Sequence, residues 1–163
     1  MAVIEPIVDE FLREAETTKR VLARVPTAKL AWKPHAKSRS LGELAWHVAS
    51  IPKRVSAMAL LEDADVTAHK QPPLPETAEA ILEAFTAGIP ETKENLGKLG
   101  DEDLRKTIHF HRGEITMARL PKIGFLRAVM LNHWYHHRGQ LSIYLRLLDV
   151  PVPSIYGPTA DEA

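Results

Sequence analysis

Residues 126–148, LRAVMLNHWYHHRGQLSIYLRLL, contain the clearest helical pattern of the chain. Apolar residues and two histidines recur here at steps of three and four, at Leu126, Met130, His133, His137, Leu141, Tyr144 and Leu148. Because an α-helix turns once in about 3.6 residues, these positions fall on one face. Pro121 suits the first position of a helix, and Pro151 and Pro153 cannot continue one. We therefore expect a helix over residues 121–148.

Three further segments show the same periodicity. They are expected as helices over about 3–25, 41–58 and 78–99. Ser40 and Glu43 have the S-x-x-E spacing of a capping box, which predicts that the second helix begins at Leu41. Pro52 and Pro90 fall inside the second and third patterns and should bend or break those helices.

These helices and their long connections define the expected architecture. A chain of 163 residues has the usual size of one domain, so residues 1–163 should form a single domain. The loops are longer than is usual between helical neighbours, so several should cross the ends of the bundle. Within 101–120, apolar residues alternate around His111-Arg112-Gly113-Glu114, which indicates a short β-hairpin or an irregular extended loop. The predicted fold is all-α, a single four-helix bundle with long crossover connections and that hairpin before the last helix.

The composition excludes several classes of function. The absence of cysteine rules out disulfides, thiolate metal ligands and a cysteine nucleophile, and it fits a reducing compartment. Lys and Arg number 21, as do Asp and Glu, which argues against electrostatic binding of nucleic acid or an anionic membrane. Glu5, Asp9 and Glu10 do not fit an export signal, and no apolar stretch reaches the roughly 20 residues of a membrane span. We expect a cytoplasmic protein with no nucleic-acid and no membrane partner.

Histidines are the main candidate functional residues. His133 and His137 lie one helical turn apart, where two imidazoles can bind one metal ion. Their place in the middle of the apolar stripe predicts that both point into the bundle. His47, at the edge of the apolar face of the second helix, can supply a third ligand. Three protein ligands with an open position are typical of a catalytic metal site, and imidazoles suit zinc, nickel, copper or iron.

Two alternatives accompany this hypothesis. Each inward histidine could instead be a core residue that is hydrogen-bonded to a neighbour, although two stacked imidazoles are hard to satisfy in that way. His109 and His111 form a rival pair, because residues two apart share one face of an extended segment. Their expected place in a loop favours reading them as exposed residues without a ligand role.

Three stretches of the chain resemble the DinB/YfiT-like metalloprotein superfamily. They are NHWYHHRGQL at 132–141, LGELAWHVA at 41–49 and the tail PSIYGPTADE at 153–162. The resemblance spans essentially the whole chain and implies a four-helix bundle, often a homodimer, that holds one divalent metal ion with three histidines. By position those ligands are His47, His133 and His137. We expect zinc in the first place, with nickel, iron or manganese as alternatives.

The same resemblance implies chemistry with a small thiol. Members with assigned reactions include transferases and isomerases that use low-molecular-weight thiols such as bacillithiol or mycothiol. We therefore expect a metal-dependent transferase that acts on a small-molecule thiol and an electrophile. A metal-dependent hydrolase is the second choice, and a metal-stabilised ligand-binding or structural dimeric bundle is the non-enzymatic alternative. No catalytic residue is assigned; Arg138 is read as support for the site, a dimer contact or a solvated arginine, and Gly139 as a point of close helix approach.

Overall fold

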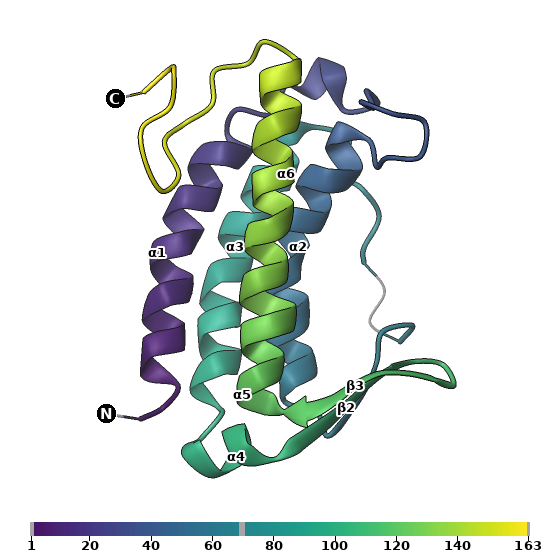
Figure 1. Ribbon diagram of the computed structural model, residues 1–163, viewed down its shortest axis with the longest axis vertical. Helices are drawn as coiled ribbons and strands as arrows, with labels where there is room; N and C mark the ends of the chain where they lie inside the picture. Colours follow the sequence, from purple (N-terminus) through teal and green to yellow (C-terminus); the bar gives the residue numbers. More distant parts are fainter. Residues whose placement is uncertain (1, 69–70, 163) are drawn as a thin grey trace.

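Long helices that lie side by side form most of the computed structural model, which describes residues 2–68 and 71–162 (Figure 1). Their bounds are α1 Glu5–Leu22, α2 Leu41–Ala59, α3 Ala78–Gly97 and α6 His133–Leu147. Both α1 and α2 pack against α3 and α6. The expected helices are present, with ends that differ by a few residues. Within the described residues, no helix has the length and apolar character needed to cross a bilayer.

The start of α2 is fixed by local hydrogen bonds. The Glu43 backbone N–H donates to the Ser40 hydroxyl at 3.1 Å, and the Ser40 N–H donates to the Glu43 carboxylate at 2.6 Å. This reciprocal pair confirms the predicted capping box. Pro52 and Pro90 both lie inside continuous helices, so the expected breaks do not occur. The connection before α2 contains a short 3₁₀ helix, η1 (Thr27–Lys29).

The last helical run contains a stretch of π-helix just before the histidine motif. It consists of α5 (Lys122–Phe125), η2 (Leu126–Asn132) and α6 in direct succession. The π-helical stretch is η2, and the backbone N–H of His133 bonds Ala128 O, five residues back. A π turn holds more residues than an α turn, so the buried face is delayed by one position along the sequence.

The predicted buried face is therefore confirmed only in part: Leu126, Met130 and Leu141 are buried, whereas His133, His137, Tyr144 and Leu148 are partly exposed. After Leu126 and Met130, the core positions are Leu131, Trp134, Arg138, Leu141 and Leu145. His133 and His137, which an uninterrupted α-helix would place at the centre of the apolar face, lie at its edge and are half-buried. The π-helical stretch is the physical reason. It holds one more residue than an α-helical stretch would, so every residue after it is rotated away from the position that a regular α-helix predicts.

A three-stranded sheet lies across one end of the helices (Figure 1). β2 (Thr107–Arg112) and β3 (Ile115–Pro121) are antiparallel and confirm the predicted hairpin. β1 (Asp63–Asp65) pairs in parallel with β2, and its three residues, Asp-Ala-Asp, have no apolar alternation that could have predicted a strand. The short helix α4 (Asp101–Arg105) was also not predicted. The chain is mostly helical, with a small sheet, and the all-α prediction is corrected accordingly.

The core is aromatic where α1, α3 and α6 meet. The Trp134 ring lies 5.8 Å from that of Phe11 and 6.0 Å from that of Phe85, measured between centroids. Arg138 is 1% exposed and forms an ion pair with Glu14 of α1 at 2.5 Å, which excludes the reading of a solvated arginine. No atom of a neighbouring helix in the described chain comes within 4 Å of a Cβ placed on Gly139, so the expected close approach is wrong.

Candidate metal centre

Three histidine side chains from two helices converge on one point. His47 comes from α2, and His133 and His137 come from successive turns of α6. The Nε2 atom of His133 lies 2.8 Å from Nε2 of His137 and 3.4 Å from Nε2 of His47. The ring centroids are 4.5–5.2 Å apart. Each residue thus presents a nitrogen to a common centre, which is the arrangement of a metal-binding group.

In two of these rings, the hydrogen bond made by Nδ1 determines whether Nε2, which faces the common centre, carries a proton or a lone pair. His137 Nδ1 lies 2.8 Å from Gln140 Oε1, and His133 Nδ1 lies 3.3 Å from Val129 O. Oxygen atoms of an amide and a carbonyl only accept, so each Nδ1 must donate its proton. The Nε2 atoms of the two neutral rings are then bare, and their lone pairs face each other at 2.8 Å. Either a proton shared by the two nitrogens or a metal ion relieves this contact, and a metal ion would also engage Nε2 of His47.

The π-helical stretch contributes to this orientation. In an uninterrupted α-helix the Val129 carbonyl would accept the backbone N–H of His133. That N–H bonds Ala128 O instead, so it does not compete with the His133 ring for the Val129 carbonyl. The π-helical turn therefore serves the site, as π-bulges often do.

Burial keeps the imidazoles neutral. It lowers the pKa of His47 to about 3 and that of His137 to about 4, and it also lowers the pKa of His133. The positive charge of Arg39 is the second cause of the low pKa of His47. A proton is therefore a poor candidate for the cation, whereas a divalent metal ion fits a set of three neutral nitrogen donors. His47 Nδ1 is buried and forms no hydrogen bond of normal geometry with a described residue, although the Gln71 side chain lies close enough to raise the pKa of His47.

A second group, formed by Asp63, His109 and His111, is held together differently. The Asp63 carboxylate accepts from His111 Nε2 at 2.6 Å and contacts His109 Nδ1 at 3.0 Å. His111 Nδ1 also donates, to Gly113 O at 2.7 Å, so His111 donates from both nitrogens and keeps no free lone pair. The hydrogen bond to Asp63 raises the pKa of His111. The prediction of exposed loop histidines is corrected, since both lie on β2 and are partly buried, in an ion-paired cluster.

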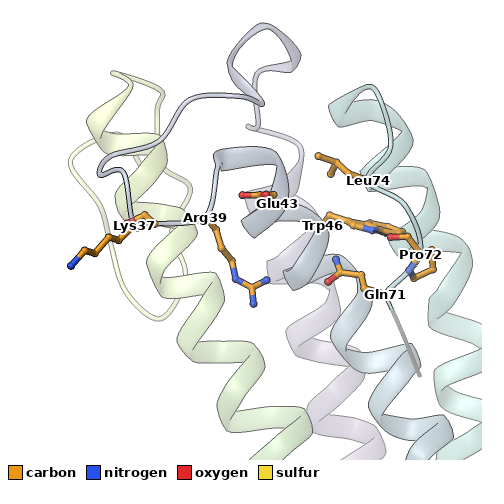
Figure 2. Close-up of a pocket in the computed structure, with 8 residues that line it drawn as sticks. Lys37, Arg39, Glu43, Trp46, Gln71, Pro72 and Leu74 are labelled. Carbon is orange, nitrogen blue, oxygen red and sulfur yellow. Dashed lines mark hydrogen bonds between the residues drawn. The ribbon is translucent and has the colours of Figure 1, made fainter. Parts of the chain in front are cut away.

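A cavity of about 520 Å³ opens beside the three-histidine cluster. His47 and His133 contribute to its lining, together with side chains of α2, β2 and β3. A second cavity of about 440 Å³ shares Arg39 and Gln71 with the first. Figure 2 shows Arg39 and Gln71 at the lower edge of this second cavity, with Trp46 beside Pro72. Sequence reasoning assigned no role to Arg39 or Gln71, because neither belongs to a motif or to an apolar face.

Comparisons with known proteins agree with this architecture. The model described as "DinB family" matches residues 3–163. The uncharacterized protein YrdA of Bacillus subtilis (strain 168) is 28% identical over 160 residues, which cover 94% of this chain and 90% of that protein.

Two solved structures have a similar fold. A DinB-like protein from Bacillus cereus ATCC 10987 superposes with a TM-score of 0.72 at 23% identity, and the match covers 91% of this chain and 94% of that one. A DinB-like protein from Bacillus subtilis, YjoA, superposes with a TM-score of 0.73 at 19% identity, over 95% of this chain and 100% of that one. At these identities the likeness shows a common fold.

Proposed function

The chain belongs to the DinB family, and on this premise we propose that it is a metal-dependent transferase that uses a low-molecular-weight thiol. One divalent ion is held by His47, His133 and His137. The observation that carries the proposal is the meeting of bare imidazole nitrogens at 2.8 Å in a group without a carboxylate. When bound, the ion supplies a Lewis acid that favours the thiolate form of a small thiol.

The residues of the chain have separate roles in this proposal. The three imidazoles remain neutral and so stay available as ligands. Gln140 and Val129 hold two of the rings in the orientation that exposes Nε2. The adjoining cavity gives the thiol and its electrophile a place next to His47 and His133, partly shielded from water by α2 and β2. Positioning two reactants in one cavity lowers the entropic part of the barrier.

The proposal also includes the identity of the ion, the arrangement of the long helices and the oligomeric state. Zinc is the first choice of ion, because three histidines and an open position are a common catalytic zinc set. We also propose that α1, α2, α3 and α6 form a single four-helix bundle and that the active protein is a homodimer.

Thiol titration tests the proposed function. We expect 2-mercaptoethanol to bind zinc-loaded protein at least about tenfold more tightly than metal-free protein, because the ion stabilises the thiolate. His133→Ala should abolish this difference. His109→Ala, a histidine outside the three-histidine cluster, is the matched control and should retain it. Equal thiol affinity of the zinc-loaded and metal-free proteins would refute the transferase proposal and favour a structural role for the ion.

A further inference from the structure

The cavity beside the three-histidine cluster is lined by positive charges. Arg39, Arg54 and Arg112 all contribute to it, and none of its described lining residues is Asp or Glu. Arg39 precedes α2, Arg54 lies on α2 and Arg112 ends β2, so the guanidinium groups come from separate parts of the chain. A cavity with this lining concentrates positive potential. The lining therefore favours an anionic ligand.

Two of these arginines lack a carboxylate partner. Arg39 and Arg112 take part in no ion pair with a described Asp or Glu, whereas Arg127 is paired with Glu10 and Arg138 with Glu14. A guanidinium group binds a carboxylate or phosphate through two parallel hydrogen bonds when no internal partner occupies it. These two side chains are thus available to a ligand.

The remaining wall of the cavity is largely apolar. Ile51, Val55 and Met58 contribute one side from α2, and Phe110 contributes from β2. All four residues are at most 8% exposed, so their side chains are held in place by the core and form a well-packed apolar wall. Ligand cavities of this kind combine an apolar lining with a few polar groups that fix orientation. A volume of about 520 Å³ accommodates a small organic molecule.

We propose, building on the proposed function, that the substrate that occupies this cavity is an organic anion with an apolar body. Its carboxylate or phosphate contacts Arg39 and Arg112. Its hydrocarbon part packs against Ile51, Val55 and Phe110, which places the molecule beside His47 and His133. The arginines thus favour ligands with a negative charge, and the apolar wall favours ligands with a hydrocarbon part.

Calorimetric titration of metal-free protein tests the inference without relying on the ion. The probes are octanoate and octyl phosphate, the neutral analogue octanol, and acetate, which lacks the hydrocarbon body. We expect octanoate or octyl phosphate to bind about tenfold more tightly than octanol, as one charge-assisted contact implies. The preferred anion of the two identifies the head group. Acetate should bind more weakly than octanoate.

Variants assign the charge recognition to named residues. Arg39→Gln and Arg112→Gln should each lower the affinity for octanoate by about tenfold and leave that for octanol unchanged. Arg20→Gln is the matched control, since Arg20 lies on α1, which contributes nothing to the described cavity lining. Equal binding of octanoate and octanol, or an equal loss in the Arg20 variant, would overturn the inference. If octanoate is preferred as expected but zinc does not increase the affinity for 2-mercaptoethanol, the transferase proposal fails and the inference about the anionic ligand stands.

Discussion

Gln140 is the residue that most directly controls the orientation of a proposed ligand. Its side-chain oxygen accepts from His137 Nδ1 at 2.8 Å, so the bare Nε2 of His137 points at the centre of the cluster. Gln140 itself is exposed. Its contribution is therefore separable from folding, unlike that of the buried Arg138.

Replacement of Gln140 should weaken metal binding. Because partners behind a ligand usually change metal affinity by about 10–100-fold, we expect Gln140→Ala to lose affinity in that range. Gln140→Glu keeps an acceptor at the same position and should bind at least as tightly as the wild type. Competition with a chromophoric chelator measures both affinities. An unchanged affinity in Gln140→Ala would show that the hydrogen bond to His137 does not support the site.

Sequence patterns predict some residues of the candidate site and not others. His133 and His137 stand out because a spacing of four places both on one side of any helix. His47 follows from its place near the apolar face of the second helix. Arg39 and Gln71 reach the same region from irregular segments, and no periodicity relates such positions to a helix 60 or more residues away. Their role depends on tertiary structure.

Among the elements, η2 explains why His133 and His137 lie elsewhere relative to the core than the apolar periodicity predicts. A regular 3.6-residue repeat from Leu126 leads to His133 and His137 as buried positions. The π-helical turn moves the core positions to Trp134 and Arg138 and leaves the histidines at the boundary between core and cavity. A π-helical turn has no sequence signature that periodicity can detect, so this shift could not be predicted. The boundary position suits a site that needs both fixed ligands and access.

A side-chain cluster joins β1 to β2, in addition to the apolar packing of Ala64, Ile108 and Phe110 in the core. β1 has three residues, two of them aspartates, and its pairing with β2 places Asp63 opposite His109 and Asp65 opposite His111. Asp63 accepts hydrogen bonds from both histidines, and this cross-strand contact offsets the low strand propensity of aspartate.

This cluster should make the pairing of β1 with β2 sensitive to pH. The pKa of His111 is raised by Asp63, and the pKa of Asp63 is lowered by His111. The stabilisation by the raised histidine is complete below about 6.5 and is lost as pH rises through its folded pKa. The stabilisation by the lowered carboxylate is present above about 3.9 and is lost in more acidic solution.

Asp63→Asn should therefore reduce the free energy of unfolding more at pH 5.5 than at pH 9. Urea denaturation at the two pH values measures the difference, with Asp65→Asn as a comparison on the same strand. An NMR titration should show the pKa of His111 falling toward about 6.5 in Asp63→Asn. A variant whose destabilisation is the same at both pH values would contradict the ion-paired description.

For the whole molecule, the core and the candidate metal centre are separate. Trp134, Phe11 and Phe85 pack where α1, α3 and α6 meet, whereas the histidines lie between α2 and α6 at the edge of a cavity. The long helices and the hairpin follow from apolar periodicity, which is a local property of the sequence. The pairing of β1 and the lining that the two cavities share depend on segments far apart in the chain, and local patterns carry no information on them.

This separation predicts that the metal ion is not needed for folding. Metal-free protein should keep most of its helical circular dichroism, because the helices are packed by a large apolar core and only His47 of the three ligands is buried. The thermal midpoint should still fall. Saturation at about 100 times the dissociation constant adds about 2.7 kcal/mol, which corresponds to roughly 5–10 °C for a chain of this length. Loss of helicity on removal of the metal would identify the site as structural.

The central claim is that His47, His133 and His137 together hold one divalent ion, and elemental analysis tests it most directly. Purified wild-type protein should contain about one divalent metal ion per chain, as a single three-ligand site implies. His47→Ala, His133→Ala and His137→Ala should each lose most of it, whereas His109→Ala and His111→Ala should retain it, because His111 has no free lone pair. Full metal content in His133→Ala, or its loss in His111→Ala, would contradict the account.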